Sequence, residues 1–307
     1  MPHLHPLPPK GTIGIMAPSS PVEEDKLQNG IRYFEKMGYK TITKSSCFAR
    51  DHYLAGSAEQ RASDLMELVH SPEVDAIFFA RGGFGSAAML PLLDYPSIRK
   101  SRKLMVGYSD ITALQWGIYA KTGLPSLSAG MPATDFNTSP VHPQFEKSFW
   151  NFMETGKIDF HLNVPCNKQS GTIRGKALPG TLSVATKLSG SPYFPALDRT
   201  ILIFEDVGEP RHKIEGYLWQ ARLSGWFDRC NAVILGDFSK PEKETFPDSP
   251  PLEEIFARVF HGFDLPVITG VPYGHIDHKI PFPVGVEISL SFGLTIQISS
   301  IDTLFDS

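Results

Sequence analysis

Short apolar runs alternate with amphipathic segments along the first 135 residues of the chain. The amphipathic segments carry apolar residues at helical spacing and begin near residues 22, 57, 86 and 110. The runs that predict strands lie between them, at 12–17, 40–44, 76–80, 103–108 and 125–128. Strands alternating with helices of this length are typical of βαβ units, in which helices cover both faces of a parallel sheet. We therefore predict a flavodoxin-like, doubly wound α/β domain over residues 1–135.

The hydrophobic pattern changes after residue 135. Residues 136–172 are richer in Pro, Asn and Ser, and they predict a connector with one helix around 142–152. Beyond it, strands are predicted at 200–204, 232–235 and 267–269, and helices at 181–188, 213–223 and 252–260. The run from 286 to 298 alternates apolar and polar residues around Gly293 and predicts a hairpin. Residues 173–307 are therefore expected to form a smaller, mixed α/β, β-rich domain.

Three polar or glycine-rich turns directly follow predicted strands of the first domain. They are Pro18-Ser19-Ser20, Arg81-Gly82-Gly83 and Ser109-Asp110. In an open parallel sheet, ligands bind beyond the carboxyl ends of the strands. We therefore expect the three turns to share one rim and to contribute to a functional site.

The segment around Ser109 has the strand–turn–helix pattern in which α/β-hydrolases expose a nucleophilic serine. Gly107 and Ser109 supply the first half of a G-x-S-x-G motif, but Ile111 stands where the closing glycine belongs. A nucleophile at this position would place the N–H of Asp110 beside a developing oxyanion. Serine is also a preferred helix N-cap. The segment alone therefore leaves two interpretations, a nucleophile and a structural cap.

The glycine turn from Arg81 to Gly85 is a second candidate. Consecutive glycines let backbone N–H groups approach a ligand closely, either as a phosphate nest or as half of an oxyanion hole. The turn matches neither the Walker pattern nor G-x-G-x-x-G. A plain strand–helix turn that needs positive φ explains the glycines equally well.

A nucleophilic serine needs a base, and the base needs an orienting partner. Among ten histidines, His275 and His278 share a loop after an apolar strand, and Gly274 frees the backbone beside His275. The pair also fits a hydrogen-bonded loop or a metal site, although H-x-x-H without a nearby Cys is weak evidence for metal. The apolar strand at 200–204 ends in Glu205 and Asp206, which predicts a partnered buried carboxylate or a pair of solvated acids.

Composition narrows the class of protein. The chain has 29 basic and 33 acidic residues, a net charge of −4 and no basic stripe, which argues against a nucleic-acid partner. Its three cysteines form no disulfide framework or metal-binding pair, so we expect a reducing compartment. The first ten residues lack an apolar signal region, and no run reaches 18 apolar residues. We therefore expect a cytoplasmic protein without a membrane partner.

Five segments, spread in order over nearly the whole chain, carry a resemblance to a known family. They are Gly14-Ile-Met-Ala-Pro-Ser-Ser20, Ala80-Arg-Gly-Gly-Phe-Gly85, Val106-Gly-Tyr-Ser-Asp-Ile-Thr-Ala-Leu114, Phe204-Glu-Asp-Val-Gly-Glu209 and Pro272-Tyr-Gly-His275. Each segment alone is weakly specific, but their order and spacing together are specific. The chain resembles the serine peptidases typified by muramoyl-tetrapeptide L,D-carboxypeptidase, which include the microcin C immunity proteases.

The resemblance implies roles for particular residues. Ser109 would be the nucleophile, His275 the general base and Glu205 the acid that orients it. The N–H groups of Gly83 and Asp110 would form the oxyanion hole. The family further implies a flavodoxin-like N-terminal domain, a smaller C-terminal domain, an active site between them, no metal, no cofactor and commonly a homodimer.

Two segments depart from the family's pattern. Ser128-Ala-Gly-Met-Pro132 stands where His-Gly-Pro is usual, and Pro179-Gly-Thr-Leu182 stands where Gly-Gly-Asn-Leu is usual. We expect neither departure to touch the triad and both to alter the substrate pocket.

The resemblance implies hydrolysis of the amide bond before a terminal D-amino acid. The expected substrate is the cytoplasmic murein tetrapeptide of peptidoglycan recycling, which loses D-Ala, and the expected substrate contacts are Arg81, Gly82 and Phe84. One alternative is cleavage of a peptidyl-nucleotide amide in self-immunity or detoxification, with Phe84 or Trp116 stacking on the nucleobase. Another is a non-catalytic, flavodoxin-like ligand-binding module in which Ser109 only caps a helix.

Overall fold

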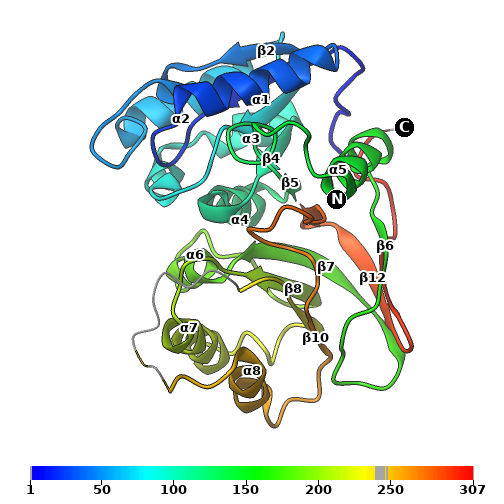
Figure 1. Ribbon diagram of the computed structural model, residues 1–307. Coiled ribbons are helices and arrows are strands. Elements are labelled where there is room, and N and C mark those ends of the chain that lie inside the picture. The colour runs from blue at the N-terminus through cyan, green and yellow to red at the C-terminus, as the bar shows by residue number, and fades with distance from the viewer. Residues whose placement is uncertain (1, 239–245, 247, 307) are drawn as a thin grey trace.

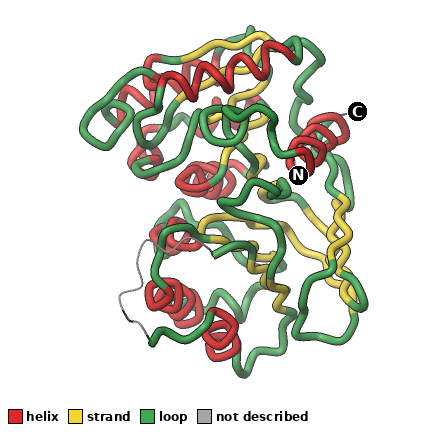
Figure 2. Tube along the Cα trace, in the orientation of Figure 1, coloured by secondary structure: helices red, strands yellow, loops and turns green. Residues whose placement is uncertain are grey.

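Two β-sheets organise the computed structural model, which describes residues 2–238, 246 and 248–306 (Figures 1 and 2). The first sheet has six strands in the order β11-β5-β4-β3-β1-β2. Its strands are β1 (Thr12–Met16), β2 (Lys40–Thr43), β3 (Ala76–Phe79), β4 (Leu104–Gly107), β5 (Ser126–Ser128) and β11 (Phe282–Val284). The strands β1 to β5 are parallel, and β11 pairs with β5 in the antiparallel sense.

The strand order of this sheet reverses between β1 and β3, which makes the carboxyl end of β1 a topological switch point. Right-handed crossovers that run to opposite sides of β1 place the first helix on one face of the sheet and the next three on the other. These helices are α1 (Glu24–Lys36), α2 (Ala58–His70), α3 (Tyr95–Ser101) and α4 (Thr112–Thr122). The prediction of a doubly wound sheet is confirmed.

The local sequence accounts for the ends and faces of these helices. Ser57 caps α2, because its side chain accepts a hydrogen bond from the N–H of Gln60 at 3.2 Å. In α1 the residues Leu27, Ile31 and Phe34 are buried at helical spacing. The segment Ser86–Leu92 forms a 3₁₀ helix that contains Pro91, a residue without the N–H that an α-helix requires.

The second sheet has seven strands in the order β10-β9-β8-β7-β12-β13-β6. Its strands are β6 (Asp159–Leu162), β7 (Gly171–Thr181), β8 (Thr200–Glu205), β9 (Ala232–Leu235), β10 (Val267–Thr269), β12 (Glu287–Phe292) and β13 (Ile296–Ser300). The strands β7 to β10 are parallel, whereas β12, β13 and β6 are antiparallel. This mixed sheet confirms the predicted second architecture, and β12 and β13 form the predicted hairpin around Gly293.

Four more helices complete the described fold, namely α5 (Pro143–Thr155), α6 (Leu182–Lys187), α7 (Arg211–Leu223) and α8 (Leu252–Phe260). Helix α5 contacts the part of the chain that builds the first sheet. Its Trp150 stacks on Tyr39, the residue before β2, with ring centroids 5.4 Å apart. The two chain ends lie near α5 (Figure 1), and Leu4 forms a bridge with Phe305.

Two strands belong to sheets that their place in the sequence does not suggest. Strand β11 comes late in the sequence yet forms the edge of the first sheet, where it pairs with β5. Strand β6 lies inside the segment expected as a connector, and it forms the edge of the second sheet beside β13. The chain therefore returns to the first sheet after building most of the second.

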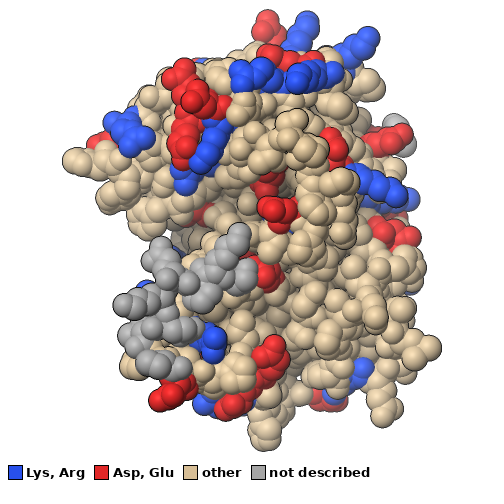
Figure 3. Space-filling view, viewed as in Figure 1, with Lys and Arg blue, Asp and Glu red and all other residues tan. Residues whose placement is uncertain are grey.

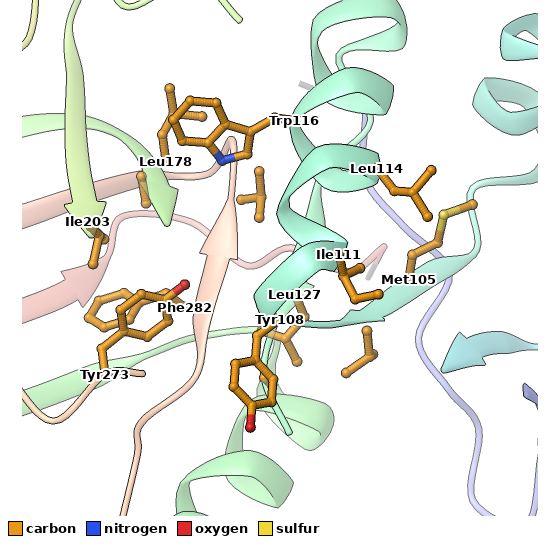
Figure 4. Close-up of a cluster of buried hydrophobic side chains, with 14 of the residues drawn as sticks. Met105, Tyr108, Ile111, Leu114, Trp116, Leu127, Leu178, Ile203, Tyr273 and Phe282 are labelled. Carbon is orange, nitrogen blue, oxygen red and sulfur yellow. The ribbon is translucent and has the colours of Figure 1, made fainter. Parts of the chain in front are cut away.

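Helix α4 joins the two sheets through a continuous apolar core. Trp116 is fully buried, and its indole N–H donates to the carbonyl of Pro179 in β7 at 2.8 Å. Figure 4 shows Trp116 beside Leu178. In the same view, Phe282 and Tyr273 lie across from Leu127 and Tyr108. Because the core is shared, the carboxyl ends of β4 and β8 have a fixed relative position.

The surface carries both signs of charge. Acidic and basic side chains are interspersed over the face drawn in Figure 3, as expected for a chain whose charges nearly balance. In the described part of the chain, no helix has both the length and the apolar character needed to cross a bilayer.

Candidate active site

Ser109 occupies a strained turn at the carboxyl end of β4. Its φ of 66° lies in the left-handed region, which non-glycine residues seldom adopt and which is common at functional sites. Gly82 permits this arrangement, because a Cβ there would lie 2.7 Å from the Cβ of Ser109. No side-chain cap forms at the start of the 3₁₀ turn Ser109–Ile111 or of α4. The structural-cap interpretation of Ser109 is therefore wrong.

The Ser109 hydroxyl instead faces a histidine and a carboxylate. Its Oγ lies 3.0 Å from Nε2 of His275, and Nδ1 of His275 lies 2.6 Å from Oε2 of Glu205. Glu205 is the last residue of β8 and is fully buried. Gly274 has a φ of 131°, and a Cβ there would lie 2.9 Å from Glu205, so glycine lets the histidine loop reach the strand end.

The second acid at the end of β8 points elsewhere. Asp206 accepts hydrogen bonds from the N–H groups of Ser183 at 2.7 Å and Val207 at 2.9 Å. Burial and then the neighbouring charge of Glu205 raise the pKa of Asp206 to about 6. The structure therefore excludes the expectation of two solvated acids and brings Glu205, not Asp206, to the histidine.

The environment of His275 favours an imidazole that accepts a proton. Burial disfavours its charged form, but the charge of Glu205 and the hydrogen bond to it outweigh burial, so the pKa of His275 lies above its usual value. His278 does not share this environment, because its ring lies instead beside that of His142, with ring centroids 6.0 Å apart. Across residues 2–238, 246 and 248–306, no cluster of three or more His, Cys, Asp and Glu side chains could hold a metal ion.

The three turns at the carboxyl ends of β1, β3 and β4 are tied together by Asp110. Its carboxylate accepts from the hydroxyl of Ser19 at 2.7 Å and from the N–H of Ser86 at 2.9 Å. The hydroxyl of Ser86 donates back to the carbonyl of Asp110 at 2.6 Å. Arg61, almost fully buried, donates to the carbonyls of Pro18 and Gly85. The turns thus form one rigid rim.

Gly83 and Asp110 lie on this rim beside Ser109. Gly83 has a φ of 121°, and a Cβ there would overlap the hydroxyl of Ser20. That hydroxyl in turn accepts from the N–H of Phe84 at 3.1 Å. Asp110 belongs to the first turn of a 3₁₀ helix, where N–H groups have no acceptor within the helix. The main chain can therefore offer donors close to the serine.

The residues expected to contact substrate lie around the same rim. Arg81 donates Nη1 to the carbonyl of Pro21 at 3.0 Å and helps to line a cavity of about 380 Å³. The other residues of that cavity are Glu23, Lys26, Ala133, Thr134 and Asn137. Phe84 is 54% exposed and meets the ring of Tyr53 edge-on at 5.7 Å. Trp116 is buried in the core, so the suggestion that it stacks on a nucleobase is wrong.

One expectation about the departures from the family's pattern is also wrong. Thr181, the last residue of β7 and part of the altered segment, donates its hydroxyl to Oε1 of Glu205 and so touches the candidate triad directly. Ser128, in the other altered segment, shares a 2.8 Å hydrogen bond with the hydroxyl of Tyr273 in the histidine loop. Side chains from both altered segments therefore support the site.

Sequence reasoning also missed a buried group next to His275. The ring of Tyr108 lies 4.9 Å from the imidazole ring, and its hydroxyl lies 3.4 Å from a carboxylate oxygen of Asp135. Asp135 forms an ion pair with Lys279, whose side chain is only 5% exposed. No short motif contains these three residues, so a single sequence offers no signal that groups them.

A hydroxyl, an imidazole and a carboxylate in hydrogen-bonded series, above a rim of backbone donors, define a serine hydrolase.

Comparison with known proteins agrees with this class. The family model described as LD-carboxypeptidase N-terminal domain matches residues 13–129, and the model described as LD-carboxypeptidase C-terminal domain matches residues 174–290. The murein tetrapeptide carboxypeptidase of Pseudomonas aeruginosa is 30% identical, with 91% of this chain and 92% of that protein aligned. The chain belongs to the LD-carboxypeptidase family of serine peptidases, as its motifs predicted.

Two branches of this family are similar to the chain. The microcin C7 self-immunity protein MccF of Escherichia coli is 28% identical, with 94% of this chain and 92% of that protein aligned. The crystal structure of the muramoyltetrapeptide carboxypeptidase of Oxalobacter formigenes superimposes with a TM-score of 0.88 at 27% identity, covering 96% of this chain and all of that one. The comparisons thus leave the particular substrate open.

Proposed function

We propose that Ser109, His275 and Glu205 form a catalytic triad that hydrolyses the amide bond before a terminal D-amino acid. The observation that carries the proposal is the hydrogen-bonded series from Ser109 Oγ to His275 at 3.0 Å and from His275 to Glu205 at 2.6 Å. In this proposal residues 1–135 supply the nucleophile and the oxyanion donors. Residues 173–307 supply the acid and the base, and 136–172 connect the two regions.

The chemistry follows from the geometry in balanced steps. His275 takes the proton of Ser109 as Oγ bonds to the carbonyl carbon, and the N–H groups of Gly83 and Asp110 stabilise the oxyanion by about 3 kcal/mol each. The C–N bond then breaks while His275 gives its proton to the leaving amine. Water hydrolyses the resulting ester through the same base and restores the serine. Glu205 holds the Nδ1–H tautomer of His275 throughout.

The proposed substrate is the murein tetrapeptide, with D-Ala as the leaving group. Support comes from the names of two similar proteins, the murein tetrapeptide carboxypeptidase of P. aeruginosa and the muramoyltetrapeptide carboxypeptidase of O. formigenes. This substrate implies a role in cytoplasmic peptidoglycan recycling, and we propose a homodimer as the working form.

An exopeptidase must also recognise the terminal carboxylate of its substrate. Arg81 is the candidate, because it directly precedes Gly82, which packs against Ser109, and because it lines a cavity together with Lys26. An arginine–carboxylate contact is a charge-assisted hydrogen bond worth about 1.5–3 kcal/mol. Gly82 would let the peptide approach the serine closely, and the exposed ring of Phe84 would contact its apolar part.

A peptidyl-nucleotide amide is the second candidate substrate. The exposed aromatic pair of Phe84 and Tyr53 beside Gly83 favours it, because nucleobases stack on such rings. The similarity to MccF points the same way. The non-catalytic alternative loses its basis, since Ser109 contacts a histidine instead of capping a helix and the chain belongs to a hydrolase family.

The test is mass spectrometry of the protein incubated with L-Ala-γ-D-Glu-meso-diaminopimelyl-D-Ala, beside the Ser109→Ala variant. We expect the wild type alone to release D-Ala. Release by neither protein would move the proposal to the peptidyl-nucleotide amide, and equal release by both would refute the role of Ser109.

The carboxylate contact is tested with the same peptide carrying a C-terminal amide. The wild type should prefer the free acid by about 10- to 100-fold in kcat/KM. Arg81→Gln should lose most of this preference, whereas the control Arg229→Gln, which removes a surface ion pair with Asp198, should keep it. An unchanged preference in Arg81→Gln would exclude Arg81 as the carboxylate contact.

A further inference from the structure

A buried ion pair connects the loop of the general base to the nucleophile side of the site. Lys279 lies four residues after His275, and Asp135 lies in the segment that follows β5. Their side chains are 5% and 8% exposed, and they contact each other directly. Asp135 is itself fixed, because its carboxylate accepts from the N–H of Met131 at 2.8 Å and from the hydroxyl of Thr134 at 2.6 Å.

Tyr108 connects this ion pair with the triad. The ammonium of Lys279 lies 5.0 Å from the centre of the Tyr108 ring, at cation–π distance, and 5.5 Å from that of Phe145. Burial raises the pKa of Tyr108 well above its usual range, so its hydroxyl stays protonated and donates to Asp135. The ring of Tyr108 also lies beside the imidazole of His275, with ring centroids 4.9 Å apart.

The loop of His275 has other anchors to the first sheet, but they flank Lys279. On one side Tyr273 bonds to Ser128, and on the other β11 pairs with β5. The loop therefore contacts the first sheet on both sides of Lys279. A buried ion pair is also a poor way to gain stability, since apolar side chains of similar size are often as good or better. The position of the pair beside the imidazole therefore needs another explanation.

We propose that Lys279 is a positioning residue of the reaction, which acts with Asp135 through Tyr108 to hold the imidazole of His275 between Ser109 and Glu205. The proposal rests on the role given to His275 above. Lys279 touches no reacting atom in this scheme. Lys279 instead fixes the position of the His275 imidazole and contributes to the charge around it.

The charges around His275 come from several elements, and they determine in which direction each substitution should shift the pKa of His275. Glu205 faces the imidazole from β8, Asp135 from the segment after β5, and Lys279 from its own loop, while Tyr108 is neutral. The charge of Lys279 lowers the pKa of His275 and that of Asp135 raises it. Neutralising Lys279 alone must therefore raise the pKa, neutralising Asp135 alone must lower it, and neutralising both must bring it back between the two.

The experiment is an NMR titration of the His275 ring in the full chain, with the signal assigned through His275→Gln. The variants are Lys279→Met, Asp135→Asn and the double variant. The control is Lys168→Met, which removes a lysine that pairs with the highly exposed Asp264. We expect shifts of about half a pKa unit or more, upward for Lys279→Met and downward for Asp135→Asn, and none for the control.

A second signal in the same spectra reports position. The proton shared by His275 and Glu205, whose heavy atoms are 2.6 Å apart, should be strongly deshielded in the wild type and the control. It should broaden or disappear in the single variants, and Lys279→Arg should restore it. If the pKa of His275 and this proton are unchanged in folded single variants, the pair is structural only and the proposal is refuted.

Turnover separates this proposal from the proposed substrate. With D-Ala release as the assay, Lys279→Met should lower kcat by about 10- to 100-fold and leave KM within about twofold, because misplacing a base affects the chemical step. If the wild type releases no D-Ala but the NMR pattern appears, the positioning role stands and the substrate proposal fails. If D-Ala is released and Lys279→Met retains wild-type kcat, the positioning role fails alone.

Discussion

Replacing Glu205 by glutamine keeps the shape of a fully buried side chain and removes its charge. Glu205 has two partners, because Oε1 accepts from Thr181 and Oε2 from His275. A glutamine amide has only one oxygen. The hydroxyl of Thr181 can turn and accept from the amide NH₂, which leaves the oxygen for the Nδ1–H of His275. The variant therefore keeps the tautomer and loses mainly the charge that stabilises the imidazolium.

The loss of rate in Glu205→Gln can be estimated from the attraction between Glu205 and the charged His275. At about 4 Å between charge centres and an effective dielectric constant of about 20, the attraction is about 4 kcal/mol. That corresponds to about a thousandfold lower rate for the step in which His275 becomes charged. The equivalent exchange in the chymotrypsin-type triad, where the tautomer changes as well, costs about 10⁴-fold.

The pH profile gives a second signature with a definite sign. His275 must be neutral to act as a base, so activity falls as the pH drops through its pKa. In the wild type this pKa is raised by Glu205 against the effect of burial. Without the charge, burial remains and the pKa falls below its usual value. The acidic limb of kcat/KM in Glu205→Gln should therefore move to lower pH by about one unit or more.

The assay is D-Ala release from the tetrapeptide as a function of pH, with Thr181→Val as the matched control that loses a hydrogen bond to Glu205 and keeps the charge. We expect Thr181→Val to lose far less activity and to keep the position of its acidic limb. A loss below about tenfold in Glu205→Gln, or an acidic limb that moves to higher pH, would refute this account of Glu205.

Three further substitutions test the surroundings of the site. Asp110→Ala leaves two buried donors without an acceptor, at about 1–3 kcal/mol each, so the free energy of unfolding measured with urea should fall by about 2–6 kcal/mol; a change below 1 kcal/mol would contradict the rim described above. Gly82→Ala places a methyl group against Ser109 and should lower kcat for D-Ala release by about 100-fold or more, and wild-type kcat would show that the turn tolerates displacement. Gly30→Ala should lower the melting temperature although alanine is the better helix former, because the added Cβ overlaps the carbonyl of Pro132; a higher melting temperature would show that this contact relaxes easily.

The periodic part of the fold was predictable because local sequence determines it. In the first half, apolar runs and amphipathic helices alternate, and α1 buries the residues that the spacing indicates, namely Leu27, Ile31 and Phe34. The turn at Ser109 was located in the same way. Its two interpretations could not be separated locally, since the deciding contact is with His275, 166 residues further along the chain. The sequence itself reduced the candidates for the base to the loop of His275 and His278, and the resemblance to the family then pointed to His275.

The parts that were missed depend on contacts between distant segments. Strand β11 has three residues, one of them Pro283, and it forms only because β5 leaves an edge beside it. Lys279 and Asp135 are charged residues in loops, which normally face solvent, and they are 144 positions apart. Thr181 lies in a segment that was expected to alter only the substrate pocket, yet its hydroxyl donates to the second oxygen of Glu205.

The late return of β11 to the first sheet has a consequence for the newborn protein on the ribosome. Residues 1–135 emerge first and begin to fold, but their sheet keeps an open edge at β5 until residues 282–284 follow. His275 emerges shortly before β11, so Ser109 gains its proposed base at about the time that β11 covers the edge of the first sheet. A chain cut short before this stretch carries an exposed strand edge, a feature that favours aggregation, and lacks the histidine that contacts Ser109. Under the proposed mechanism, hydrolysis can begin only after His275 has been made and has reached Ser109, so shorter chains are harmless to the peptides around them.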